Sequence, residues 1–251
     1  MVLRSVSFLL SIVVACYGSI EIEKYLKTCN RNSPDVNDCL VDAIQSGITA
    51  MAGGIKEIGV PPVDPYLQKE QKFEYKNNQI QAKMVSKDIL VIGLKDSTVK
   101  DARLRVDDDS FHLEVDMFSP AVSVSGRYEG SGSYNALNVI AQGTFVTNMT
   151  DLVYTWKLDG KPETINNEVY MRIKSFYMRP DVSNMQVHLT NESPETKDLT
   201  ALGVRVVNEN WRLLYKELLP IAQANWDKIG VRVANKIFLK TPFNRLFPNT
   251  S

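Results

Sequence analysis

The first clear pattern of apolar positions starts near residue 33 and has the spacing of a helix. Apolar residues recur there every three or four positions, which places them on one helical face; they are Val36, Leu40, Ile44, Ile48, Met51 and Ile55. Ser33, Pro34 and Asp35 are typical of a helix N-terminus, with the serine as the capping residue. The glycine pair at 53–54 predicts the end of this helix.

Between residues 73 and 189 the pattern changes to alternation, which is typical of half-buried strands. The apolar positions of one strand are Phe111, Leu113, Val115 and Met117, and those of the next are Val122, Val124, Gly126 and Tyr128. Similar runs occur at 137–149, 152–158, 169–178 and 185–189. The stretches "SPA", "GSGSYN", "LDGKPET" and "RPDVSN" resemble turns, so we expect consecutive antiparallel strands.

The C-terminal quarter returns to helical spacing. Its apolar stripe runs from 211 to 237, or roughly 40 Å of helix; it contains Trp211, Leu214, Leu218, Ala222, Trp226, Ile229, Val233 and Ile237. Pro220 interrupts the stripe and should bend the helix. Such an apolar side must be covered, and the strands are the available partner. We therefore expect a single α+β unit in which a curved antiparallel sheet wraps around a long helix.

The chain begins with the three-part pattern of a secretory signal peptide. Arg4 precedes an apolar stretch at 6–16, and Gly18 suits cleavage. Because the stretch is too short to span a bilayer, we expect a signal peptide at 1–18 followed by one secreted domain at 19–251. A buried N-terminal helix is the alternative.

Removal of a signal peptide would also remove Cys16 and leave two cysteines, Cys29 and Cys39. In an oxidising compartment two cysteines most simply form one disulfide. This bond would tether an N-terminal strand at 19–29 to the first helix. A metal site would need further cysteines or nearby histidines, and none is available.

Composition and motifs argue against several classes of function. The chain has 29 basic and 29 acidic residues, so nothing favours nucleic acid or an anionic membrane. No nucleophile elbow, zinc-protease motif or phosphate-binding loop is present. The segment 106–110 lacks the glycine and glutamate of a calcium loop and is interpreted as a solvated turn. His112 and His188 have no recognisable catalytic partner, so we expect neither an enzyme nor a cofactor or metal site.

Three sequences match the acceptor for N-linked glycans, at Asn148, Asn191 and Asn249. Asn148 is the best candidate, provided that it faces outward. Pro194 follows the serine of the second site, and the third lies at the extreme C-terminus, which weakens both.

Three longer blocks give the chain a specific resemblance. They are "SPDVNDCLVDAI" preceded by Cys29, "GIKEIGVPPVDP" at 54–65 and "LGVRVVNENWRLLYKELLP" at 202–220. With these blocks the chain resembles the insect takeout and haemolymph juvenile-hormone-binding proteins over nearly its whole mature length. The resemblance implies a tubular lipid-binding fold, a disulfide between Cys29 and Cys39, and extracellular carriage of a hydrophobic small molecule. The segment after Leu189 and the Ala141-Gln142-Gly143 run depart from the family pattern, which leaves the ligand open.

The leading hypothesis is therefore a secreted, monomeric, non-enzymatic carrier of a terpenoid, fatty acid or other lipid, held in an apolar tunnel. The candidate lining comprises Leu40, Ile44, Ile48, Met51, Phe111, Leu113, Val115, Met117, Val124, Tyr128, Trp211, Leu214, Tyr215 and Leu218. Tyr128 would direct its hydroxyl inward and could hold the polar end of a ligand, although a backbone carbonyl or a water is an equal partner. The alternative is an extracellular signalling or interaction protein whose interior is filled by side chains; the sequence identifies no receptor. A hydrolase ranks third.

Overall fold

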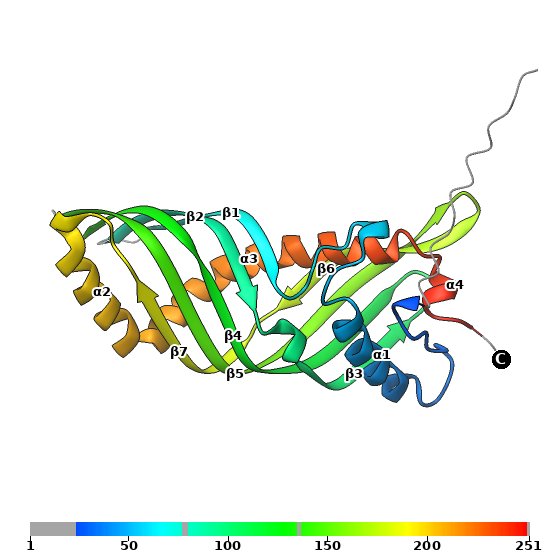
Figure 1. Cartoon of the computed structure of the whole chain (residues 1–251). Helices are drawn as coiled ribbons and strands as arrows, with labels where there is room; N and C mark the ends of the chain where they lie inside the picture. The colour runs from blue at the N-terminus through cyan, green and yellow to red at the C-terminus, as the bar shows by residue number, and fades with distance from the viewer. Residues whose placement is uncertain (1–23, 77–79, 135–136, 250–251) are drawn as a thin grey trace, which may run out of the picture.

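A computed structural model describes residues 24–76, 80–134 and 137–249. A seven-stranded antiparallel sheet curls around one long helix, as expected from the sequence (Figure 1). The helices are α1 (Val36–Ala50), α2 (Lys197–Glu209), α3 (Trp211–Phe238) and α4 (Phe243–Leu246), and the strands are β1 (Tyr66–Lys76), β2 (Ile80–Ile92), β3 (Thr98–Val106), β4 (Phe111–Tyr134), β5 (Leu137–Ile165), β6 (Glu168–Met178) and β7 (Asp181–Leu189). Short 3-10 turns lie at Lys56–Ile58, Leu94–Asp96 and Pro194–Thr196.

Strands β4 and β5 pair along almost their whole length and form the spine of the sheet. On its other edge β4 pairs first with β3 and then with β2, which in turn pairs with β1. On its other edge β5 pairs first with β7 and then with β6. The spine therefore carries two groups of strands. We call residues 98–119 and 152–178 the α1 half, since α1 and α4 lie at that end, and residues 66–76, 80–92, 121–134, 137–150 and 182–189 the α2 half (Figure 1).

The two halves meet at a bend. There the inward-facing residues of a strand change from odd-numbered to even-numbered positions. In β4 the buried residues are odd-numbered up to Ser119 and even-numbered from Val122 onward. In β5 the change falls between Met149 and Leu152, and the register of the two strands does not shift across it. Both strands therefore contain one additional residue at the same place, which bends a sheet without changing which side is inside.

The α1 half has a tightly packed interior. Its inward residues Phe111, Val115 and Met117 are almost fully buried. The ring of Phe111 lies 5.3 Å from that of Phe238 in α3 and 6.0 Å from that of Phe243 in α4. Aromatic pairs at these spacings contribute beyond the area that they bury. Side chains from the sheet, α3 and α4 thus fill this end.

Helices α2 and α3 are each attached to a strand edge by an asparagine amide. The side chain of Asn235 in α3 accepts a hydrogen bond from Ile173 N at 2.9 Å and donates one to Ile173 O at 2.8 Å. Asn208 in α2 makes the same pair of bonds with Val187, at 2.8 and 2.9 Å. Each amide satisfies the two backbone groups that a further strand would otherwise satisfy.

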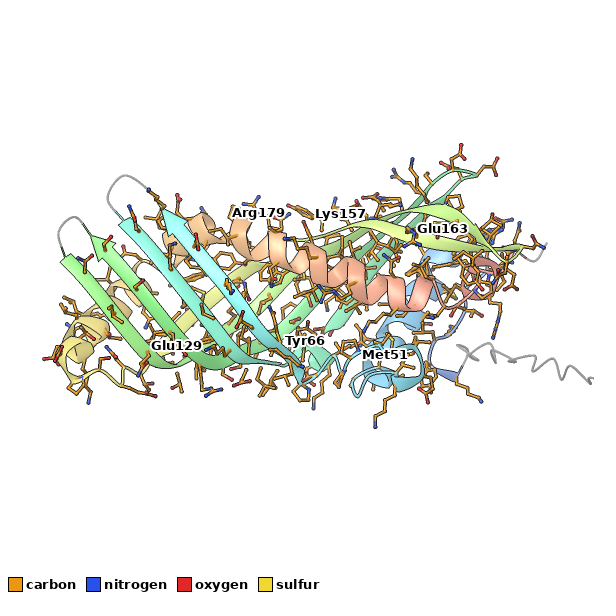
Figure 2. All side chains as sticks on the ribbon, turned by 90° about the horizontal axis from the view of Figure 1, so that it is seen from above. Met51, Tyr66, Glu129, Lys157, Glu163 and Arg179 are labelled. Carbon is orange, nitrogen blue, oxygen red and sulfur yellow. A yellow bond between two sulfur atoms is a disulfide. The ribbon has the colours of Figure 1, made fainter. Side chains whose placement is uncertain are left out.

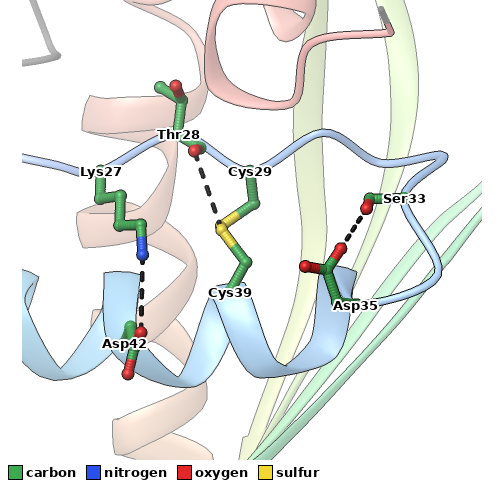
Figure 3. The surroundings of a disulfide bond; sticks show 7 residues. All are labelled: Lys27, Thr28, Cys29, Ser33, Asp35, Cys39 and Asp42. Atoms are coloured by element: carbon green, nitrogen blue, oxygen red, sulfur yellow. Dashed lines mark hydrogen bonds and ion pairs between the residues drawn. A yellow bond between two sulfur atoms is a disulfide. The ribbon is translucent and has the colours of Figure 1, made fainter. Parts of the chain in front are cut away.

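The expected disulfide joins Cys29 to Cys39 and fastens the N-terminal segment to α1 (Figure 3). The start of α1 differs from the expectation. Asp35, not Ser33, is the N-cap residue, and its side chain makes no capping bond. Instead the Ser33 hydroxyl donates to the Asp35 carboxylate (Figure 3).

The described part of the predicted N-terminal strand, 24–29, is irregular, while 19–23 and the predicted signal peptide lie outside the described residues. Helix α1 ends at Ala50, so Met51 and Ile55 lie beyond it, and Ile55 forms a bridge with Val60. Ile55 matches the helical spacing only by coincidence. Its side chain is buried, but the residue lies in the bridge with Val60 and not in the helix.

All four predicted turns are wholly or mostly strand: residues 130–134 of "GSGSYN" belong to β4, and residues 181–184 of "RPDVSN" belong to β7. "SPA" lies within β4 and "LDGKPET" within β5, which turns instead at Asn166 and Asn167, both with positive φ. Pro120 is tolerated because β4 changes partner there, with β3 paired up to Phe118 and β2 from Ser123 onward. Because neither β3 nor β2 pairs with β4 at Pro120, the missing N–H of the proline removes no hydrogen bond to these strands.

Candidate inner-wall binding site in the α2 half

The inner face of the α2 half is apolar and largely half-buried, although Val122, Tyr128 and Val182 on it are buried. Its residues come from β2, β4, β5, β7 and α3 and pack beside the main core; they include Val91, Val124, Met149, Met185, Trp211 and Tyr215. Cross-strand pairing places Val124 opposite both Val91 and Thr147, so the wall is continuous across strands. Apolar side chains that retain accessible surface on a concave face are suited to contact a hydrophobic ligand.

Helix α3 borders this wall with two aromatic residues and runs along the opening of the curl (Figure 2). The rings of Trp211 and Tyr215 lie 6.4 Å apart, and the Tyr215 hydroxyl donates to Pro180 O at 2.8 Å. Burial, followed by the charge of Asp181, raises the pKa of Tyr215 to about 12. This hydroxyl is therefore neutral at physiological pH and adds no charge to the wall.

Tyr128 faces inward, as the alternation predicts, and is buried. Its hydroxyl donates to Thr190 O at 2.9 Å, which is the backbone-carbonyl alternative considered from the sequence. Burial raises the pKa of Tyr128, so the hydroxyl keeps its proton. A ligand could still donate to this oxygen, but the single donor of Tyr128 is already engaged.

A cluster of buried hydroxyl groups lies at the boundary between the halves. Ser119 Oγ is 2.7 Å from Ser97 Oγ and 2.9 Å from the Tyr154 hydroxyl. All three side chains are nearly inaccessible. Next to it, Gln45 of α1 donates to Ser97 O at 3.1 Å and accepts from Val99 N at 2.8 Å. The alternation of apolar residues gave no signal for this cluster, because serine occupies an inward position there.

The structure divides the sequence-derived lining residues into separate groups. Leu40, Ile44, Ile48 and Met51 join the core beside β3, and Phe111, Leu113, Val115 and Met117 are buried in the α1 half. Val124, Tyr128, Trp211 and Tyr215 belong to the α2 half, and Leu214 is half-buried there. The remaining member, Leu218, is wrong as an inward residue, because its side chain is 37% exposed and that of Leu219 is 4% exposed. Two adjacent leucines made the helical phase ambiguous by one position.

A surface depression of about 350 Å³ lies on the opposite side of the sheet from this wall. Its lining includes Lys83, Ser131 and Ile140, and Ser131 pairs with both of the others. These positions alternate with the inward residues Met84 and Tyr128, so the depression is separate from the inner wall.

Charged groups form a network on the outer face of the α1 half. His112 Nδ1 is 2.6 Å from Asp159, and its Nε2 is 3.3 Å from Glu114. Ser175 donates to Asp159 at 2.8 Å rather than to the histidine, so this arrangement lacks the serine–histidine contact of a nucleophilic site. Sequence spacing could not reveal these partners, which are 47 and 2 positions from His112. Among the described residues, no group of three acidic, histidine or cysteine side chains could hold a metal ion.

The sequons differ in their surroundings. Asn148 is exposed, on the opposite side of β5 from Met149, and its Oδ1 accepts a hydrogen bond from Ser123. Asn191 is half-buried, and its Nδ2 donates to Thr196 and Thr200, each at 2.8 Å. A glycan at Asn191 would replace one of the two N–H groups of Nδ2 and so remove at least one of these bonds. Within the described ranges, no helix is long and apolar enough to cross a membrane.

Comparisons with known proteins agree with this architecture. The model of the family "Haemolymph juvenile hormone binding protein (JHBP)" matches residues 7–248. The chain is 20% identical over 228 residues to the circadian clock-controlled protein daywake of Drosophila yakuba, with 88% of this chain and 86% of that protein covered. Daywake of Drosophila melanogaster is 19% identical with the same coverage. The crystal structure of Epiphyas postvittana Takeout 1 has a TM-score of 0.72 and 20% identity, over 89% of this chain and 100% of that one.

Proposed function

Since the chain belongs to the haemolymph juvenile hormone binding protein family, we propose that it is a secreted, non-enzymatic carrier of a hydrophobic small molecule. The observation that carries this proposal is the half-buried apolar wall of the α2 half. The α1 half is already filled by its own side chains, so the ligand is assigned to the α2 half. The family description, together with the apolar side chains of the wall, supports a terpenoid, a fatty acid or another lipid.

Burial of the ligand provides the affinity. Each Å² of apolar surface removed from water contributes about 25 cal/mol. The wall offers aliphatic, methionine and aromatic side chains and a neutral Tyr215 hydroxyl, so an uncharged chain or ring is favoured over a charged group.

A pair of variants tests the location. Val124→Trp places a large side chain on the inner wall, whereas Ser125→Trp places the same side chain on the opposite side of the same strand. In displacement of a fluorescent fatty-acid analogue, we expect Val124→Trp to weaken binding by at least about tenfold. Ser125→Trp should bind like the unchanged protein. Equal affinities for the two variants would contradict the α2-half site.

Organic extraction of the purified protein followed by mass spectrometry addresses the ligand itself. We expect a hydrophobic molecule at close to one per chain. One observation also supports a second function: the buried side chains of the α1 half pack against one another and fill that part of the interior. Absence of both an extracted molecule and probe binding would favour the signalling or interaction protein.

Secretion and glycosylation belong to the same proposal. Expression in insect cells should release the protein into the medium, with a new N-terminus near Ser19 and a glycan on Asn148. Treatment with peptide-N-glycosidase should then lower its mass, and Asn148→Gln should remove that shift. Intracellular retention of the full chain would contradict secretion.

A further inference from the structure

Helix α2 packs against the sheet with one side and exposes apolar residues elsewhere. Thr200, Val204, Val207 and Asn208 are half-buried, and the helix has no fully buried residue. Leu199, Leu202 and Val206, spaced three and four apart, are 41%, 56% and 48% exposed. Amphipathic helices normally turn their larger apolar residues toward the core, so this arrangement is unusual.

Two more exposed apolar residues lie next to α2. The hydroxyl of Thr196, directly before the helix, donates to the carbonyl of Ile140, whose side chain is 71% exposed. Leu213 is 63% exposed in the first turn of α3, where its N–H donates to Asn210 O between the two helices. We define the end patch as Ile140, Leu199, Leu202, Val206 and Leu213. Helix α2, which carries three of these residues, lies at the end of the molecule opposite α1 and α4 (Figure 1).

We propose that the end patch docks the protein on the surface of a neutral lipid layer, where the hydrophobic ligand is collected or released. Five partly exposed aliphatic side chains present roughly 300–500 Å² of apolar surface, whereas a stable protein interface needs about 800 Å² per partner. The patch is therefore too small for a lasting dimer. It is large enough for a few side chains to enter the apolar region of a lipid layer reversibly.

The charges near the patch favour a neutral layer over an anionic one. Residues 197–218 carry four basic side chains and three acidic ones. One of the basic groups, Arg212, is engaged with the protein, because its Nη2 donates to Ser183 O at 2.9 Å and its guanidinium lies 4.5 Å from the Trp211 ring. With so little net charge, attraction to anionic headgroups is weak and docking depends on apolar contact.

The patch also adjoins the proposed ligand site, on which this inference rests. Trp211 belongs to the inner wall, and Leu213, two residues further along α3, belongs to the end patch. Since residues two apart in a helix point to nearly opposite sides, a ligand that leaves a lipid layer at this end has to pass around the first turn of α3 to reach the apolar wall.

Flotation with phosphatidylcholine vesicles tests the docking. We expect the unchanged protein to float and Leu202→Asp and Leu213→Asp to lose at least about tenfold in vesicle affinity. Leu67→Asp and Val153→Asp are matched controls, because these residues are 59% and 58% exposed elsewhere on the sheet, and they should float normally. Raising the salt concentration should leave flotation unchanged.

Three outcomes would overturn the docking: no flotation of the unchanged protein, an equal loss in the controls, or a marked loss of flotation at high salt. Sedimentation is measured alongside, and a dimer that both patch variants abolish would assign the patch to a second copy instead. Displacement of the fluorescent fatty-acid analogue, without vesicles, separates this inference from the proposed function. Patch variants should keep their probe affinity. Loss of probe affinity in the patch variants would place these residues in the ligand site, and absence of probe binding in the unchanged protein would contradict the carrier itself.

Discussion

The α1 half and the α2 half use the same two long strands and similar apolar residues, yet their interiors differ in burial. Phe111, Val115 and Met117 in the α1 half are almost inaccessible, whereas Val124 and Met149 in the α2 half are half-buried. The difference comes from what covers them. The α1 half is closed by α1, α4 and the end of α3, while α2 is attached beside β7 and buries none of its own residues. Apolar content alone therefore does not determine whether a sheet face becomes core or binding surface.

The largest expected contrast is in the cost of removing an inner side chain. Phe111→Ala should lower the free energy of unfolding by about 3–5 kcal/mol, because it leaves a cavity among packed rings. Val124→Ala should cost about 1 kcal/mol or less, since its side chain is half-buried and leaves no closed void. Urea unfolding measures both. Similar costs for the two variants would remove the distinction between the halves.

The disulfide should also stabilise the α1 half. Replacing Cys29 and Cys39 together by serine frees a short loop, and the chain-entropy model assigns somewhat less than about 3 kcal/mol to such a loop. We expect this loss in thermal or urea unfolding, with probe binding in the α2 half retained once the protein is folded. Loss of binding in the folded variant would mean that the two halves are coupled more strongly than their packing indicates.

Asn235 and Asn208 make the same pair of hydrogen bonds to a strand, so replacing each of them compares how firmly α3 and α2 are attached. Asn235→Ala leaves two backbone groups of Ile173 without partners at a well-packed helix and should cost about 2 kcal/mol. Asn208→Ala does the same to Val187, but at the loosely held α2, so we expect less than about 1 kcal/mol and faster hydrogen exchange in α2. Equal stability losses with unchanged exchange would show that α2 is as firmly attached as α3.

The smallest expected effect on the free energy of unfolding comes from charged groups on the outer faces, and it depends on pH. Hydrogen bonds from Lys157 first and Arg103 second lower the pKa of Glu114 to about 2 from 4.5. A lowered pKa stabilises the folded state above the unfolded value, so this contribution is present above about pH 4.5 and is lost as the pH falls toward about 2. Solvent screening limits it to about 1 kcal/mol. Glu114→Gln should flatten this part of the stability profile; an unchanged acid limb would exclude Glu114 as a contributor. The Arg127–Asp88 pair of the α2 half is more exposed and should add less.

Alternation and helical spacing predicted much of this structure because they report which residues need cover. They gave the long helix and the inward faces of both parts of β4, including Tyr128. These patterns failed where pairing with a strand distant in the sequence decides the local structure. Pro120 has the signature of a turn, but it occupies the interval between two partners of β4. Pro162 likewise lies beyond Gly160, the last β5 residue that pairs with β4.

The candidate site could be predicted only in part, for a similar reason. Apolar residues such as Met117 and Met149 give the same signal along the chain, although one is packed and the other is half-buried. Helix α2 was missed although Leu199, Leu202 and Val206 recur at helical spacing, because the predicted C-terminal helix began only at Trp211. The partners of His112 come from its own strand and from a neighbouring strand, and only the register of β4 against β5 brings Asp159 opposite it.

The bend between the halves has a consequence for how such a protein can change its shape. Between the pairs Ser119–Leu152 and Ala121–Thr150, Pro120 and Asp151 occupy the same step of the ladder, and Asp151 has a φ of 51°. Deleting these two residues together would restore an uninterrupted pleat, keep every other pair in register and leave the same side chains inside. Deleting either one alone would reverse the faces of one strand against its neighbour. Inserting or deleting one residue in β4 together with one in β5 can therefore add or remove the bend of the sheet while its strand pairing is kept.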